Sequence, residues 1–324
     1  MNSLSYLGIA YDKKNLALNE NVQKSPKLLS EFIISYLARC HRTDRYKKMY
    51  LNTLNHILKF CDLKGISQPY TNQVDSEFCE DFIFYLQDTC NHMQNTVKGN
   101  FERVVAMLQK AINYGYPVNN TYHEVYVEEE DVNTVYLDMT EITRIFYFKG
   151  ITRFNEEVKD LFIVGCLTGL RYSDYSKLTE ANFINHNTQI RIKTRKTGAV
   201  IQLPVHPFVR DIFEKYGNQM PKSRHIGYFN KAVKGICKTI GIDTPVNYER
   251  TVGTKIVRKT IPKWQQISSH TARRSFATNA FLSGIPPYRI MLITGHKSEK
   301  SFFKYVRITR EENALTLSNH RFFQ

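Results

Sequence analysis

Apolar residues recur at three- and four-residue steps along most of the chain, which is the period of an α-helix that buries one face. In the first third of the chain this period predicts four helices, over about residues 26–37, 43–58, 77–86 and 96–113. Thr43 is the expected N-cap of the second helix. Four helices within about ninety residues predict a compact helical domain.

The helical period breaks at Gly115 and Pro117, and an acidic run follows at residues 128–131. These acids resemble a ligand cluster, but a contiguous charge run is usually a solvated linker. We therefore expect a domain boundary within residues 121–135. Residues 1–25 have no firm period, and we expect them to form a loosely attached arm.

In the second half, helical structure restarts over residues 137–142 with Thr140 as the expected N-cap, and residues 158–167 form a mostly buried helix. The pattern then predicts a β-hairpin, with strands at 189–193 and 199–205 around the turn residues Arg195-Lys196-Thr197-Gly198. Helical signals return over residues 208–216, 228–240, 270–282 and 288–292. The predicted fold is mainly α with a small β-hairpin.

The charge of the chain points to a polyanionic partner. The net charge is +15 and the pI is about 9.4, and Lys and Arg that neutralise phosphates release counterions from nucleic acid. With 42% hydrophobic and 23% charged residues, the composition suits a globular protein and excludes a mainly disordered chain.

The six cysteines include no C-x-x-C pair, so we expect reduced thiols rather than a zinc or redox motif. The N-terminus lacks the pattern of a secretory signal, and no apolar stretch approaches about 18 residues. We therefore expect the protein in the cytoplasm, where DNA is available, with no membrane partner.

Four stretches carry candidate chemistry. Arg171 follows a glycine at the end of an apolar helix, and His296 follows Gly295. His270 and Arg273 are three residues apart, which places both side chains on one helix face where they can address the same phosphate. Tyr305 follows nine residues after His296. Each signal alone is weak, because a lone Arg is usually a surface cation and a Tyr in an apolar run is usually core.

In this order, and with a lysine in the hairpin turn, these residues resemble the signature of the tyrosine site-specific recombinases of the phage integrase family, which includes integrases of phages and of conjugative or mobilizable elements. The resemblance covers about residues 136–307. It implies a SAM-like helical domain at 26–120 that binds the DNA core site, a catalytic domain at 136–310, and a C-terminal tail at 311–324.

The resemblance implies a role for each matching residue. Tyr305 is the nucleophile that forms a 3′-phosphotyrosyl bond and leaves a free 5′-hydroxyl. His270 is the candidate base, and His296 donates a hydrogen bond to a non-bridging oxygen or steers Tyr305. Lys196 protonates the leaving oxygen, although Lys193 and Arg195 are close enough in sequence to leave its register open.

Arg171 and Arg273 clamp the phosphoryl oxygens, and elementary chemistry favours this assignment independently. A free tyrosine has a pKa of about 10, so roughly one in a thousand is ionised at pH 7 and needs a base or a cationic pocket. Guanidinium forks hold the developing charge without deprotonating. Asp174 orients His270 or Arg171, or else caps the following helix.

No metal, ATP or other cofactor is expected. The bond energy is kept in the enzyme ester, the sequence has no G-x-x-x-x-G-K-[ST] loop, and no dispersed Asp and Glu set suits two magnesium ions.

Double-stranded DNA with specific core sites is the expected partner. Candidate DNA contacts are Arg42, Arg45, Lys47 and Lys48 at the start of the second helix, together with Arg274. The basic stretch at 241–269 adds backbone contacts or forms a solvated loop. By resemblance the protein assembles as a tetramer on DNA and passes through a Holliday junction, with its tail packed on a neighbouring subunit or in cis. Accessory DNA-bending or directionality proteins and association with the nucleoid are also expected.

Three other functions remain open at this point. A type IB topoisomerase uses the same tyrosine chemistry to relax supercoils. A DNA-binding regulator would keep the fold without catalysis, and a metal-dependent nuclease would cut DNA by another route. The sequence departs from the family pattern at Thr294, where Leu is common before Gly-His, and this change is expected to alter packing rather than chemistry.

Overall fold

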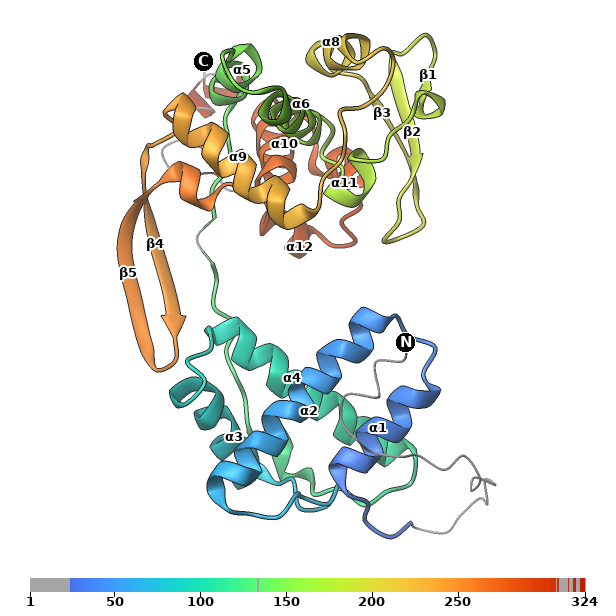
Figure 1. Ribbon diagram of the computed structural model, residues 1–324, viewed down its shortest axis with the longest axis vertical. Helices are drawn as coiled ribbons and strands as arrows, with labels where there is room; N and C mark the ends of the chain where they lie inside the picture. Colours follow the sequence, from blue (N-terminus) through green and yellow to red (C-terminus); the bar gives the residue numbers. More distant parts are fainter. Residues whose placement is uncertain are drawn as a thin grey trace. The chain divides into compact units, whose positions relative to one another are not determined.

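The computed structural model describes residues 24–132, 134–306, 308, 314, 317–318 and 321–323. The chain divides into two compact units (Figure 1). The first unit comprises residues 1–132 and 249–258, and the second comprises 133–248 and 259–324. The boundary at 132 lies within the expected linker. The expected arm lies almost entirely outside the described residues, as does most of the tail.

The first unit is helical, as predicted. Its elements are α1 (Leu29–Arg39), α2 (Asp44–Lys64), α3 (Ser76–Asp88), α4 (Gln94–Asn113) and the short 3₁₀ helix η2 (Asn120–Glu124). The Thr43 hydroxyl accepts a hydrogen bond from the N–H of Tyr46 at 3.3 Å, which confirms the expected N-cap. Aromatic side chains fill the core: the ring of Phe60 lies 5.3 Å from that of Phe78 and 5.7 Å from that of Phe82, both edge to face.

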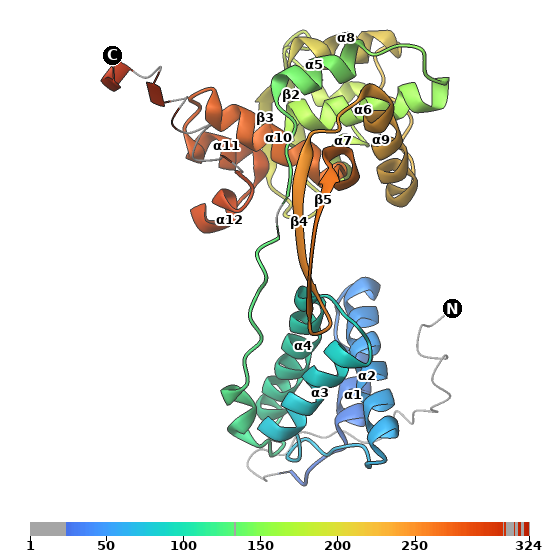
Figure 2. The ribbon, with the colours of Figure 1, turned by 90° about the vertical axis from the view of Figure 1, so that its left-hand side faces the viewer.

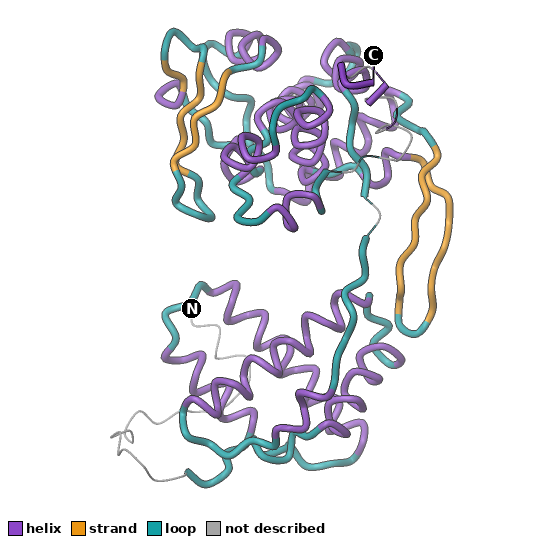
Figure 3. Tube along the Cα trace, turned by 180° about the vertical axis from the view of Figure 1, so that it is seen from behind, coloured by secondary structure: helices purple, strands orange, loops and turns teal. Residues whose placement is uncertain are grey.

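The second unit is mainly helical with a small sheet (Figure 3). Its helices are α5 (Met139–Tyr147), α6 (Arg153–Thr168), α7 (Tyr172–Tyr175), α8 (Pro207–Lys215), α9 (Ile226–Ile240), α10 (Ser269–Leu282), α11 (Pro287–Thr294) and α12 (Glu299–Phe303), with short 3₁₀ turns η3 (Glu180–Asn182) and η4 (Lys263–Gln266). The expectation of Thr140 as the cap of α5 is wrong. Asp138 caps it, because its carboxylate and that of Glu141 form a reciprocal capping box.

The predicted hairpin is present as β2 (Gln189–Lys193) and β3 (Val200–Pro204), with the two-residue strand β1 (Phe183–Ile184) added at the edge of β2. All pairs are antiparallel, and Ile190 faces Leu203 in the register. Both of these side chains are buried, so one face of the sheet joins the core of the unit. The turn between β2 and β3 closes through the N–H of Thr194 on the carbonyl of Ala199 at 2.9 Å.

A second hairpin replaces the solvated loop that was one expectation for residues 241–269. It consists of β4 (Pro245–Val252) and β5 (Lys255–Pro262) (Figure 2). Cross-strand charge pairs support it: Arg258 Nε lies 2.8 Å from Glu249 Oε2, and Lys259 Nζ lies 4.8 Å from the ring centre of Tyr248. The alternation of Val, Thr and Ile around Val252-Gly253-Thr254 was an available strand signal.

The turn of this hairpin belongs to the first unit, which includes residues 249–258. The N–H of Gly253 donates to the carbonyl of His92 at 2.9 Å, and Val252 forms a β-bridge with Met93. A Cβ at Gly253 would lie 2.8 Å from the carbonyl oxygen of Gln87, so only glycine allows this close approach.

Helices α6 and α10 pack against each other in the second unit. Gly169 ends α6 in the left-handed conformation, with a φ of +64°. A Cβ at this position would lie 2.2 Å from Cδ1 of Phe276 on α10. Glycine is therefore required here both by the backbone and by the neighbouring ring.

Gly169→Ala is expected to lower the free energy of unfolding by about 3 kcal/mol, since backbone strain and overpacking each contribute. Gly241→Ala is the matched control. Gly241 ends α9 with a φ of +77°, and a Cβ there would meet Arg144 Nη2 only at 3.8 Å. The control should cost about 1 kcal/mol. Equal losses of stability in the two variants, measured by urea unfolding, would show that the approach of Phe276 is unimportant.

Among the described residues, no helix is both long enough and apolar enough to cross a membrane. The six cysteines form no disulfide with one another.

Candidate active site

Arg171 lies between the end of α6 and the start of α7. Gly169 reverses the chain direction, and Arg171 then takes an extended conformation (φ −76°, ψ 153°) at the N-cap of α7. Its side chain is half-buried. The packing of α6 on α10 brings Arg171 close to the basic residues that α10 carries.

Helix α10 positions His270 and Arg273 on its first two turns, as their spacing predicts. Arg273 is 3% exposed, and its Nη1 donates to the carbonyl of Gly169 at 2.7 Å. Its Nη2 donates to the carbonyl of Thr294, at the end of α11. Arg273 therefore joins the ends of α6 and α11, and its guanidinium is held in one orientation.

The site is strongly electropositive. Burial lowers the pKa of Arg273 to about 10, and the charge of Arg171 acts in the same direction, whereas Tyr305 and Asp174 oppose the shift. The two like charges repel each other, and an anion bound near both guanidiniums would relieve this repulsion. The arrangement suits a phosphate group better than a neutral ligand.

His296 lies where α11 ends at Gly295, and Thr294 holds its ring. The Thr294 hydroxyl donates to the carbonyl of Ile290 at 2.8 Å, so its oxygen is left to accept from Nδ1 of His296, also at 2.8 Å. This leaves Nε2 of a neutral imidazole as an acceptor. The expectation that Thr294 alters only packing is thus incomplete, because its hydroxyl sets the tautomer of His296.

Burial lowers the pKa of His296 to about 4, with further contributions from the charges of Arg273 and Arg171. Because the folded-state pKa lies below the ordinary value of about 6.5, the unfolded chain takes up the proton first as the pH falls. The contribution of His296 to stability is therefore present above about pH 6.5 and is lost toward about pH 4.

From this shift we expect that the free energy of unfolding of the wild-type protein falls more steeply between pH 6.5 and pH 4 than that of His296→Asn. The difference should be on the order of 2 kcal/mol, since one pKa unit corresponds to about 1.4 kcal/mol and solvent screens part of the effect. His41→Asn, at an exposed position, should follow the wild type. Parallel pH curves for wild type and His296→Asn would contradict the assignment.

Tyr305 lies just after α12, where its N–H donates to the carbonyl of Phe302 at 2.7 Å. Its ring centre is 4.7 Å from that of His296. The guanidinium carbons of Arg273 and Arg274 lie 5.9 and 5.6 Å from the same ring. The structure therefore brings Tyr305 together with the predicted histidine and arginine.

His270 lies near the arginines of the site. Its pKa is lowered by desolvation, and then by the charges of Arg274, Arg273, Lys196 and Arg171. A neutral imidazole at neutral pH is the form that can accept a proton.

Lys196 lies in the exposed turn between β2 and β3, and its charge contributes to the lowered pKa of His270. The turn is tied to the rest of the site by Asp174, whose buried carboxylate accepts from the N–H of Arg195 at 3.0 Å. Asp174 therefore holds the hairpin that carries the lysine, a contact that sequence patterns did not reveal. The expectation that Asp174 orients His270 or Arg171 stays a prediction.

Most of the basic residues expected to contact DNA lie outside the group of residues around Tyr305. Arg42, Arg45 and Lys48 are exposed around the start of α2, and Lys47 is half-buried there, so all four belong to the first unit. Arg274 is half-buried beside Tyr305, and its Nη1 donates to the carbonyl of Val135 at 3.3 Å. Arg274 was expected only to contact DNA, whereas the structure places its guanidinium next to the Tyr305 ring.

Residues 28–130 match the family model of the phage integrase SAM-like domain. No curated protein matches the chain.

Several solved structures share the fold. The Tn1549 transposon integrase in complex with circular intermediate DNA is 14% identical, with a TM-score of 0.62 over 90% of this chain and 99% of that one. A lambda integrase dimer bound to a COC′ core site is 13% identical, with a TM-score of 0.64 over 87% of this chain and 78% of that one. A lambda integrase tetramer bound to a Holliday junction gives a TM-score of 0.63 at 13% identity, over 86% and 76%.

Proposed function

We propose that this protein is a site-specific DNA recombinase. The proposal is supported by the match of its first unit to the phage integrase SAM-like domain and by a fold that it shares with solved integrases. It cleaves and rejoins duplex DNA through a covalent bond between Tyr305 and a DNA 3′-phosphate. The observation that carries this proposal is the contact of the Tyr305 ring with His296, Arg273 and Arg274.

In the proposed cleavage step, the phenolic oxygen of Tyr305 attacks the scissile phosphorus, and the bond from phosphorus to the 5′-oxygen breaks. The phenol loses its proton to a neutral imidazole, which is His270 or the free Nε2 of His296. The leaving 5′-oxygen takes a proton from Lys196. Rejoining reverses these steps with the 5′-hydroxyl of a partner strand, so the ester conserves the bond energy and no ATP is consumed.

Arg171 and Arg273 stabilise the pentacoordinate transition state by donating to the non-bridging oxygens. Arg273 is suited to this role because carbonyls of Gly169 and Thr294 already fix its guanidinium, so little reorganisation accompanies the reaction. These fixed donors occupy the place that a divalent metal fills in metal-dependent nucleases. We therefore propose that strand cleavage proceeds without a metal cofactor.

Lys196 is favoured over its neighbours as the acid. Its charge acts on His270, whereas Lys193 is the last residue of β2 and no effect of its charge on His270 is among the main causes of the pKa shift. The hydrogen bond from Arg195 N–H to Asp174 supports a fixed position for this turn.

The first unit is proposed to bind the core site. Its exposed cations at the start of α2 supply phosphate or major-groove contacts, in keeping with the net charge of +15. We further propose assembly to a tetramer on DNA, with the tail packed on a neighbouring subunit. Among the described residues of the tail, Phe322 and Phe323 are 82% and 61% exposed.

The proposal is tested by selecting target DNA through covalent capture. The protein is incubated with a duplex library in buffer without Mg²⁺ or Mn²⁺, denatured with detergent, and the DNA that stays attached is sequenced. Two copies of the captured site are then placed on one plasmid. We expect adducts at a specific site and reciprocal recombination between the copies.

Other outcomes identify the rival functions. Relaxation of supercoiled plasmids without the site would indicate a topoisomerase. Specific binding without adducts would indicate a regulator, and cleavage that needs added metal would indicate a nuclease. Any of these results would overturn the proposed function.

A further inference from the structure

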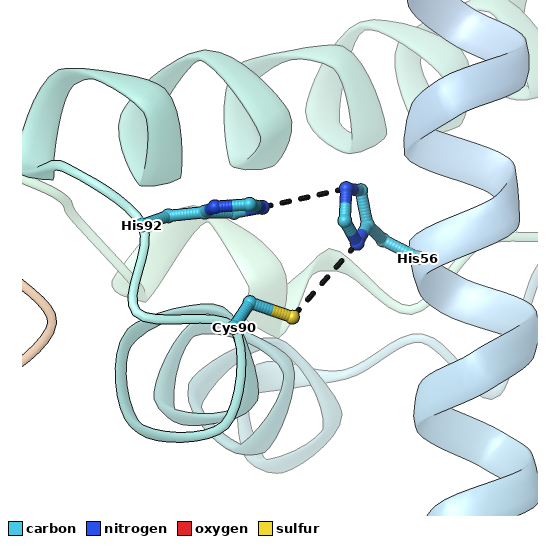
Figure 4. A group of neighbouring side chains, drawn as sticks. All are labelled: His56, Cys90 and His92. Carbon is cyan, nitrogen blue, oxygen red and sulfur yellow. Dashed lines mark hydrogen bonds between the residues drawn. The ribbon is translucent and has the colours of Figure 1, made fainter.

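A compact group of side chains in the first unit could bind a metal, far along the sequence from the candidate catalytic residues. It consists of His56 on α2, and Cys90 and His92 in the loop between α3 and α4 (Figure 4). One ligand atom from each residue can be chosen so that all three lie within 4.8 Å of one another. We propose that these residues form a binding site for a thiophilic divalent metal ion, for which Zn²⁺ is the best match.

The donor set fits zinc. One thiolate and two imidazoles are borderline-soft ligands of the kind that zinc sites use, and a fourth position would remain for water. In tetrahedral zinc sites, neighbouring ligand atoms are separated by about 3.3 to 3.8 Å. Here Nε2 of His56 lies 3.4 Å from Nε2 of His92, and its other nitrogen, Nδ1, lies 3.9 Å from Sγ of Cys90. A single ion can take only one of these two nitrogens, and with one ligand atom from each residue the three atoms lie within 4.8 Å of one another. Small side-chain rotations would complete the site.

Backbone hydrogen bonds fix the α3–α4 loop, which carries Cys90 and His92. The N–H of Cys90 donates to the carbonyl of Tyr85 at 3.1 Å, and the N–H of His92 donates to that of Leu86 at 3.1 Å. Asn91 between them has a φ of +49°, a left-handed conformation that asparagine tolerates better than most residues. As Figure 4 shows, Cys90 and His92 both point toward His56 from this loop.

Two cations near the group, Lys59 and Arg103, would repel a metal ion, but Lys59 is exposed and screened by water. Arg103 directs its Nη1 to Thr53 and Asn100 at 2.9 and 3.0 Å, and the Cys90 thiolate would supply compensating charge.

A bound ion would join α2 to the loop that receives the β4–β5 turn. The carbonyl of His92 accepts from Gly253, and Met93 is bridged to Val252. The metal would therefore stabilise the loop residues His92 and Met93, to which this turn is hydrogen-bonded within the first unit. This role is structural and separate from the chemistry at Tyr305, so its failure would leave the proposed function intact.

The test is titration of the full-length, tag-free protein with Zn²⁺ against a chromophoric chelator. We expect one equivalent bound per chain, and affinity at least about tenfold weaker in Cys90→Ser and in His92→Ala. The matched controls are Cys40→Ser, at another half-buried free thiol of the same unit, and His41→Ala, at an exposed histidine. Both controls should bind like the wild type.

Two further measurements keep the proposal falsifiable if a ligand variant folds poorly. Wild-type protein loaded with Co²⁺ should show a thiolate-to-cobalt charge-transfer band in the near ultraviolet, retained in Cys40→Ser. Zn²⁺ should also slow amide hydrogen exchange in residues 88–94 and 250–255. Absence of the band in the wild type, or binding that is unchanged in Cys90→Ser, would overturn the site.

Discussion

Tyr305→Phe is expected to bind the target site with wild-type affinity and to form no covalent protein–DNA adduct. The variant removes only the oxygen that attacks phosphorus, while the ring keeps its contacts with His296 at 4.7 Å and with the two guanidiniums. Cleavage should fall by at least about 10⁴-fold, as for loss of other covalent nucleophiles. The measurement is adduct yield on a denaturing gel beside binding by gel shift.

Tyr288→Phe is the control for this experiment. Tyr288 lies on α11 in the same unit, is 58% exposed, and accepts a hydrogen bond from Arg289. Its variant should cleave at the wild-type rate. An adduct that persists in Tyr305→Phe would remove Tyr305 from the role of nucleophile.

Arg171→Lys is expected to lose most cleavage although it keeps the positive charge. A lysine offers a point charge, whereas the guanidinium fork can donate to two phosphoryl oxygens at once. Loss of a preorganised donor to a developing anion typically costs about 10²- to 10³-fold in rate. Single-turnover cleavage on a nicked substrate would measure the chemical step separately from binding.

Arg191→Lys, at an exposed position on β2 of the same unit, provides the comparison and should leave the rate unchanged. Near-normal cleavage by Arg171→Lys would show that the bidentate geometry is not needed, and that Arg171 acts through its charge alone.

Much of the fold could be predicted because its signals are local. The 3.6-residue period located α1 to α4 and most helices of the second unit, and the turn composition around Gly198 located β2 and β3. The expected helix over residues 270–282 is present as α10 and carries both His270 and Arg273. These inferences depend on residues within one or two turns of each other, where propensity and spacing are informative.

Features that depend on distant segments were not predictable in the same way. The contact of Asp174 with Arg195 spans 21 residues, and the bond from Arg273 to Gly169 spans 104. The group of His56, Cys90 and His92 has no short metal motif, because one ligand comes from the middle of α2. The β4–β5 hairpin was missed because β5 is almost entirely exposed and both strands carry charged residues, which obscured the alternation of Val, Thr and Ile.

Thr294 shows how one substitution from a family pattern can change local chemistry. Its hydroxyl can be both donor and acceptor, so it joins the α11 backbone to the ring of His296. A leucine at this position offers no such contact. The structure therefore gives this residue a positioning role that could not be inferred from side-chain size.

The central claim is tested most directly by the chemical identity of the protein–DNA linkage. The adduct is trapped on the captured target site, digested with protease and nuclease, and sequenced by mass spectrometry. We predict a phosphate on the phenolic oxygen of Tyr305 that joins it to the 3′ end of the cleaved strand, with a free 5′-hydroxyl on the other side. A linkage at another residue, or to a 5′ end, would contradict this account.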